Sequence, residues 1–175
     1  VIIHLGDHWD MPSLSSYDVG KKSFEGRRYT KDIEAGIEGM KAFLKPIKKE
    51  QKRLKKGKRK LWTPRLVFCL GNHEFRIERA VEADAKLEGL LSYEDFNLKE
   101  MGWEVYPFLY PVIVDGVVYS HYFTSGVMGR PVSNARLLLQ KKMMSCVQGH
   151  VQDRDIAFAR KADGSSVTGI FAGIF

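Results

Sequence analysis

Four short apolar runs, each ending at a residue that can bind a metal ion, constrain the fold of this 175-residue chain more than any other feature. The first run covers residues 1–5 and leads through a glycine to Asp7, and three later runs lead to Asn72, His121 and His150. The β-branched and aromatic composition of these runs predicts strands. Ligands in open α/β sheets gather beyond the carboxyl ends of the strands, so we expect the four polar side chains to converge.

Helical periodicity separates the strand-like runs. Apolar residues recur at helical spacing from about residue 30 to 56, which predicts a long crossover helix that Pro46 kinks or splits. Shorter helical patterns cover residues 75–91, 93–101 and 133–144, and another strand-like run covers 105–110. Asp115-Gly116 and Asp163-Gly164 each join two strand-like runs and predict hairpins. We predict a single domain over residues 1–175, with a helical basic insertion at about residues 30–60.

The net charge of +7 is concentrated in one stretch of the chain. Between Lys45 and Lys60 the sequence carries a dense run of lysine and arginine and a single acid, Glu50. Such a run attracts polyanions and gains free energy from counterion release on DNA or RNA. The alternative interpretation is a solvated helix end and loop without a partner.

Composition also limits the class of protein. No apolar run approaches the roughly 20 residues of a membrane helix, and no signal peptide precedes the first strand, so we expect a soluble, cytoplasmic protein without a membrane partner. The two cysteines, Cys69 and Cys146, lie inside apolar stretches. We predict that both are buried free thiols, which fits a reducing compartment.

Three short motifs occur in the order that is typical of one enzyme family. Gly6–Asp10 resembles the GDxxD motif of calcineurin-like metallophosphoesterases, Gly71–Glu74 matches their GNH[DE] motif, and Gly149–His150 is similar to the start of their GHxH motif. His121 stands where the family has a lone histidine between the last two motifs. This resemblance spans nearly the whole chain. It implies a sandwich of two mixed β-sheets flanked by helices.

The resemblance also implies a set of metal ligands. Asp7 would bridge two divalent ions, and Asn72, His121 and His150 would complete the shell of one of them. A carboxylate, an amide oxygen and two imidazoles suit Mn²⁺, Fe²⁺, Zn²⁺ or Ni²⁺ better than Ca²⁺. Glycine precedes three of these ligands, which suits sharp turns and close approach of the backbone to an ion. A pair of such ions activates a water for attack on a phosphoryl group.

Further residues receive roles from the same motifs. His73 would protonate the leaving oxygen or steady the phosphoryl charge, and Glu74 would orient His73. Asp10 would support the site without binding metal. His8 is a candidate substrate contact or a surface residue. Arg76 could reach a phosphate, or it could form an ordinary ion pair on its helix.

The chain departs from the family pattern at two places. The opening DxH motif, which supplies an Asp and a His to the second metal, should lie on a strand before Val1, so we expect a domain that lacks its first strand and a longer native protein. Gln152 stands where the family has the second histidine of GHxH, and it would bind metal through its amide oxygen. Both departures concern the second metal site.

These observations lead to two functional hypotheses. The first is a metal-dependent phosphoesterase whose substrate is a phosphodiester or a nucleic acid. The segments Ser16–Asp18 and Phe24–Tyr29 of this chain resemble most closely the family members that bacteriophages encode. This resemblance makes DNA or RNA in the host bacterial cytoplasm a candidate substrate. The second hypothesis is a non-catalytic nucleic-acid-binding module with a degenerate metal site, motivated by Gln152 and the Lys45–Lys60 run.

Overall fold

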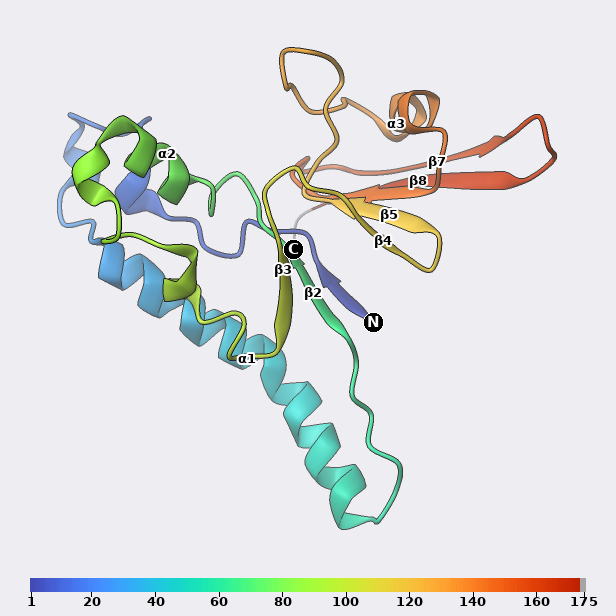
Figure 1. Cartoon of the computed structure of the whole chain (residues 1–175), viewed down its shortest axis with the longest axis horizontal. Helices are drawn as coiled ribbons and strands as arrows, with labels where there is room; N and C mark the ends of the chain where they lie inside the picture. Colours follow the sequence, from blue (N-terminus) through green and yellow to red (C-terminus); the bar gives the residue numbers. More distant parts are fainter. Residues whose placement is uncertain (174–175) are drawn as a thin grey trace. The chain divides into compact units, whose positions relative to one another are not determined.

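The computed structural model describes residues 1–173, and this part of the chain contains three α-helices and two β-sheets (Figure 1). The predicted α/β class is therefore confirmed. In chain order the elements are β1 (Ile2–His4), α1 (Tyr29–Lys56), β2 (Leu66–Cys69), α2 (Arg76–Ala83), β3 (Trp103–Tyr106), β4 (Val112–Val114), β5 (Val117–Ser120), α3 (Ala135–Lys142), β6 (Cys146–Gln148), β7 (Arg154–Arg160) and β8 (Ser166–Ala172). Short 3-10 helices lie at Pro12–Leu14, Lys22–Phe24, Ala85–Leu87 and Tyr93–Phe96.

The chain divides into two compact units. The first consists of Val1–Ile2, His8–Val67 and His73–Glu104, and the second of Ile3–Asp7, Phe68–Asn72 and the chain from Val105 onward. The strands β1, β2 and β3 form a three-stranded sheet in that order, and each of them contributes residues to both units. The boundary therefore falls inside two of the predicted motifs, directly after Asp7 and directly after Asn72.

The first unit is organised by α1, the long helix of Figure 1. Its apolar face buries Met40 and Leu44, and Gly36 lies against the indole of Trp9 so closely that a Cβ there would be 1.9 Å from the indole nitrogen. Trp9 is fully buried and stacks on Phe96 at 4.3 Å. The helix continues through Pro46, so the predicted split does not occur.

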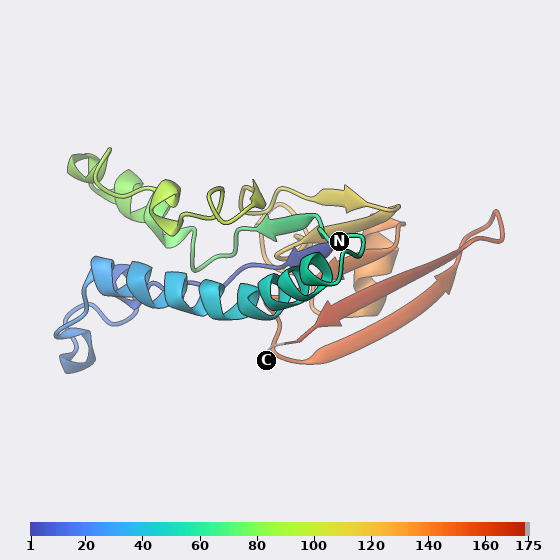
Figure 2. The same ribbon diagram turned by 90° about the horizontal axis from the view of Figure 1, so that it is seen from below.

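The second unit is built on a mixed five-stranded sheet of order β4-β5-β6-β8-β7. β6 pairs parallel with both β5 and β8. The two edge strands are antiparallel to their neighbours: β4 pairs with β5, and β7 pairs with β8. Figure 2 shows β7 and β8 as a long hairpin at the end of the chain. Both predicted hairpins are thereby confirmed, and Asp115 and Gly116 adopt the positive φ values of 50° and 78° that such a turn requires.

A compact apolar cluster holds α3 in the second unit. It contains Val118, Phe123, Val132, Ala135, Leu138, Cys146 and Phe171. Asn134 caps the helix by accepting a hydrogen bond from Leu137 N at 2.8 Å, which fixes where α3 begins. Both cysteines are free and buried, as predicted.

Three of the predicted elements have the wrong extent. The helix expected over residues 75–91 ends at Ala83, because the backbone of Asp84 is extended. The Asp84 side chain then caps the 3-10 helix that follows. The helix expected over 93–101 is a single 3-10 turn that stops at Asn97, which has a φ of 54°. The strand expected over 105–110 is Trp103–Tyr106. In each case a local turn ends the element before its apolar pattern does.

In the described part of the chain, none of the helices combines the length and the apolar character needed to cross a membrane. The arrangement of the two sheets as a sandwich stays a prediction, as does the description of residues 1–175 as one domain.

Candidate metal centre

The four predicted ligands meet within the second unit, each at the carboxyl end of a strand. Asp7 and Asn72 follow β1 and β2, His121 directly follows β5, and His150 lies two residues beyond β6. β5 and β6 are parallel, with Ser120 opposite Gln148, so they deliver the two histidines to the same edge of the sheet. This is the convergence that the strand pattern predicts.

The donor atoms lie close enough to share one ion. The ligand atoms of Asp7, His121 and His150 lie within 4.8 Å of one another. His121 Nε2 is 3.4 Å from an Asp7 carboxylate oxygen and 3.2 Å from His150 Nδ1. The side-chain oxygen of Asn72 is 2.9 Å from His121 Nε2 and 2.7 Å from His150 Nδ1. Asp7, His121 and His150 could therefore hold a metal ion, with the Asn72 oxygen beside them.

The hydrogen bond on the far side of His121 fits a metal-binding role. His121 is buried, and its Nδ1 lies 2.5 Å from the carbonyl oxygen of Leu5. A carbonyl can only accept, so Nδ1 carries a proton, and in the neutral ring Nε2 has a lone pair that can bind a metal ion. Acceptor groups at these distances are held together by imidazole protons or by a cation among them. The donor set therefore fits a divalent cation of borderline softness.

The backbone at the site adopts conformations that few residues favour. Asp7 and His150 have φ values of 55° and 64°, in the left-handed region. Non-glycine residues in this region cost of order 1 kcal/mol or more and concentrate at functional sites. Gly6 has a φ of 88°, and a Cβ on it would lie 2.5 Å from the backbone nitrogen of Gly71. The glycines before Asp7 and Asn72 thus let the two ligand-bearing turns touch, as the sequence pattern suggested.

The remaining predicted ligand, Gln152, is exposed on the turn between β6 and β7. Its part in metal binding stays a prediction. The Leu5 carbonyl is the site group that sequence reasoning missed. Its only signal was its position next to the Gly6–Asp7 turn, because a backbone acceptor leaves no trace in residue identity.

In the first unit, the predicted catalytic residues belong to one hydrogen-bonded network. A carboxylate oxygen of Asp10 lies 2.6 Å from His73 Nδ1, so Asp10 supports His73 directly. Glu74 is completely buried and accepts hydrogen bonds from the backbone N–H groups of His8 at 2.7 Å and Trp9 at 3.0 Å. Glu74 therefore fixes the loop that carries Asp10. Its predicted action on His73 itself is not established by these contacts.

The side chains of Arg76 and His8 both have hydrogen-bond partners within the first unit. The Arg76 guanidinium donates to the carbonyl oxygens of Asp10 and Met11, and it lies 3.7 Å from the Asp10 carboxylate. His8 Nε2 is 2.8 Å from the carbonyl oxygen of Gly36, and burial lowers the pKa of His8. Both side chains thus have structural contacts, and their roles in substrate binding stay predictions.

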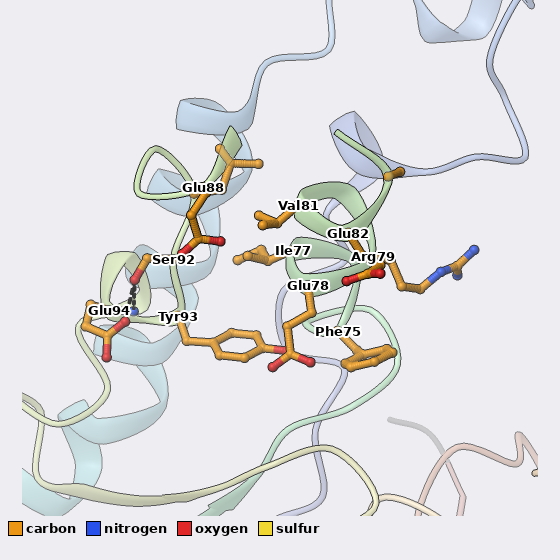
Figure 3. A pocket seen from close by; sticks show the side chains of 12 residues that line it. Phe75, Ile77, Glu78, Arg79, Val81, Glu82, Glu88, Ser92, Tyr93 and Glu94 are labelled. Atoms are coloured by element: carbon orange, nitrogen blue, oxygen red, sulfur yellow. Dashed lines mark hydrogen bonds between the residues drawn. The ribbon is translucent and has the colours of Figure 1, made fainter. Parts of the chain in front are cut away.

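The first unit also contains an open groove of about 730 Å³ between α2 and residues 88–94 (Figure 3). Its charged lining is mainly acidic, with Glu78, Glu82, Glu88 and Glu94 against Arg79. Burial, followed by the Glu78 charge, raises the pKa of Tyr93, and Figure 3 shows the two side chains pointing toward each other. A groove of this charge repels a phosphate ester, so it is a poor substrate pocket for the predicted chemistry.

No family model, curated protein or solved structure matches this chain. The functional assignment therefore rests on the geometry of the site and on the sequence motifs.

Proposed function

We propose that this chain is a metal-dependent phosphoesterase that hydrolyses a phosphodiester. The observation that carries the proposal is the convergence of Asp7, Asn72, His121 and His150 from four strand ends, with the ligand atoms of Asp7, His121 and His150 within 4.8 Å of one another. This donor set suits Mn²⁺, Fe²⁺, Zn²⁺ or Ni²⁺. Bound there, such ions would supply an activated water and would neutralise charge on the phosphoryl group.

The protein's own residues have distinct tasks in this proposal. The four donors bind metal, with Asp7 as the bridging ligand if two ions are present. His73 would give a proton to the leaving oxygen, and the contact of Asp10 with Nδ1 would hold its ring in place. Glu74 and Arg76 hold the loop of Asp10 in place.

The resemblance to calcineurin-like metallophosphoesterases supports a second ion. Asp7 and Gln152 would be among its ligands. Gln152 is exposed, so the second ion is the part of the proposal that the site geometry supports least.

The competing proposal is a non-catalytic nucleic-acid-binding module with one metal or none. It is favoured by the lysine-rich end of α1 and by Gln152 in place of a histidine. The two proposals differ in one observable, which is whether the metal-loaded protein hydrolyses an ester.

The test is hydrolysis of bis-p-nitrophenyl phosphate and p-nitrophenyl phosphate with Mn²⁺ or Ni²⁺, together with Mn²⁺ binding by calorimetry. Asp7→Asn is the informative variant, because asparagine tolerates the left-handed backbone of Asp7 but loses the charge. Asp115→Asn is its matched control, since Asp115 has a φ of 50° in the β4–β5 turn of the same unit.

We expect diester turnover that falls at least about 100-fold in Asp7→Asn, with weaker Mn²⁺ binding, and that is unchanged in Asp115→Asn. Full activity in Asp7→Asn would refute the assigned site. Mn²⁺ binding without turnover of either ester would support the binding module instead.

A further inference from the structure

One face of α1 carries a continuous stripe of lysines. An α-helix turns about 100° per residue, so positions separated by three, four, seven or eight residues share a face. Seven lysines have this spacing and lie within an arc of about 120°. All of them are exposed, and they are Lys41, Lys45, Lys48, Lys49, Lys52, Lys55 and Lys56. We call this set the lysine face.

The packing of α1 fixes the lysine face toward solvent. The buried residues of the helix, Gly36, Met40 and Leu44, lie on another side of it. The one acid within the stretch, Glu50, is bound by Arg53 at 2.7 Å, and both residues lie off the lysine face. In the part of the chain that the structure describes, none of the seven lysines takes part in an ion pair. Their charges are therefore available to a polyanion.

The dimensions of the lysine face match a nucleic-acid duplex. From Lys41 to Lys56 the helix rises about 22 Å, at 1.5 Å per residue. Duplex DNA carries one phosphate per about 1.7 Å of axis, so this length spans about 13 phosphates, of which roughly half face one side. The seven lysines therefore match in number the six or seven phosphates that one side of a duplex presents over this length.

The lysine face also lacks the feature that single strands require. Proteins that bind single-stranded nucleic acid interleave basic residues with aromatic side chains that stack on the bases. The aromatic residue nearest to the lysines on α1 is Phe43, which points away from them and lies 6.0 Å from the ring of Trp103. Trp62 is 47% exposed, and its carbonyl oxygen accepts a hydrogen bond from Gln51 on α1, but it lies outside the helix. On the lysine face itself the available chemistry is therefore contact with the phosphate backbone.

We propose that the lysine face binds double-stranded nucleic acid through its phosphate backbone, without sequence preference. The inference does not rest on the proposed hydrolysis, because binding at α1 does not require it.

Binding is measured by fluorescence anisotropy of a labelled DNA duplex of about 24 base pairs and of one of its single strands. EDTA is present so that no hydrolysis occurs, and salt is varied from 50 to 200 mM. The test variant is K48Q/K52Q/K55Q, since glutamine keeps helix propensity and removes charge. The matched control K22Q/K86Q/K141Q removes the same charge from exposed lysines outside α1.

For six phosphate contacts, the duplex affinity of the unaltered chain should fall roughly 10³-fold across this salt range, and that of K48Q/K52Q/K55Q roughly 40-fold. The control should keep the steep dependence. An equal loss in the control would mean that net charge alone drives binding, and tighter binding of the single strand would exclude a duplex surface. Either result overturns the proposal.

Hydrolysis of bis-p-nitrophenyl phosphate by K48Q/K52Q/K55Q is measured in parallel. This small diester tests the metal site without the lysine face. Unchanged turnover with lost duplex binding supports the inference, whereas duplex binding without any turnover leaves the lysine face intact and removes only the proposed enzyme.

Discussion

Replacing Gly6 by alanine should disturb both ligand-bearing turns of the metal site at once. Gly6 has a φ of 88°, and an added Cβ would lie 2.5 Å from Gly71 N and 2.6 Å from Cys69 O. Both neighbours are backbone atoms, so neither can swing aside as the tip of a long side chain would. The turn before Asp7 must therefore separate from the turn before Asn72.

Gly164 provides the control for this substitution. It has a φ of 83°, and a Cβ there would meet nothing within 4 Å. Gly164→Ala should cost about 1 kcal/mol, which is the price of a left-handed alanine alone. Gly6→Ala adds overlap with packed backbone, typically about 1–3 kcal/mol, for a total of about 2–4 kcal/mol in the free energy of unfolding.

Urea denaturation gives the stability difference, and calorimetry gives the Mn²⁺ affinity. We expect Gly6→Ala to lower the affinity by about 10- to 100-fold, as displacement of ligand-positioning groups does in other metal sites. Gly164→Ala should leave it unchanged. If Gly6→Ala destabilises the chain no more than Gly164→Ala and binds Mn²⁺ normally, the close approach of the two turns does not shape the site.

Two further predictions concern ionisable groups whose pKa is raised by burial. Tyr29 donates to the Asp95 carboxylate at 2.5 Å, and burial with this contact raises the pKa of Tyr29. Its contribution is thus present below about pH 10 and is lost as pH rises, because only the unfolded chain then ionises it. Tyr29→Phe should lower the free energy of unfolding by about 1 kcal/mol at pH 7. In urea titrations, its free energy of unfolding should also fall less steeply between pH 9 and 11 than that of the unaltered chain. If Tyr29→Phe shows the same pH dependence as the exposed control Tyr17→Phe, the reasoning is wrong. Burial raises the pKa of Cys69 to about 12 and that of Cys146 to about 11, so a thiol reagent at pH 8 should label both only after unfolding, and rapid labelling of the native chain would show that they are accessible.

The sequence predicted that the four candidate side chains would converge, because two features mark the strand ends. Each ligand follows an apolar run that ends abruptly, and a glycine precedes Asp7, Asn72 and His150. A parallel pair such as β5 and β6 then leaves little freedom in where His121 and His150 can lie. The hairpin at Asp115-Gly116 could also be predicted from the sequence, since few residue pairs other than Asp-Gly readily adopt two positive φ values.

Contacts made by the backbone were not predictable in this way. The motif resemblance gave no indication that the Glu74 carboxylate accepts hydrogen bonds from the backbone N–H groups of His8 and Trp9. The predicted helix over residues 75–91 failed for a related reason. Its apolar spacing continues past Ala83, but the cap formed by Asp84 depends on a single side-chain-to-backbone hydrogen bond, to Lys86 N at 3.1 Å.

The metal centre also contains features that a purely structural role does not explain. The left-handed backbone at Asp7 and His150 opposes folding. Beside these residues lie β5, β6 and β8, which pair in parallel and pack with α3 around one apolar cluster. Such a scaffold can hold a strained site in place. The arrangement is therefore better explained by a ligand that the acceptors bind than by any contribution they make to the stability of the unit.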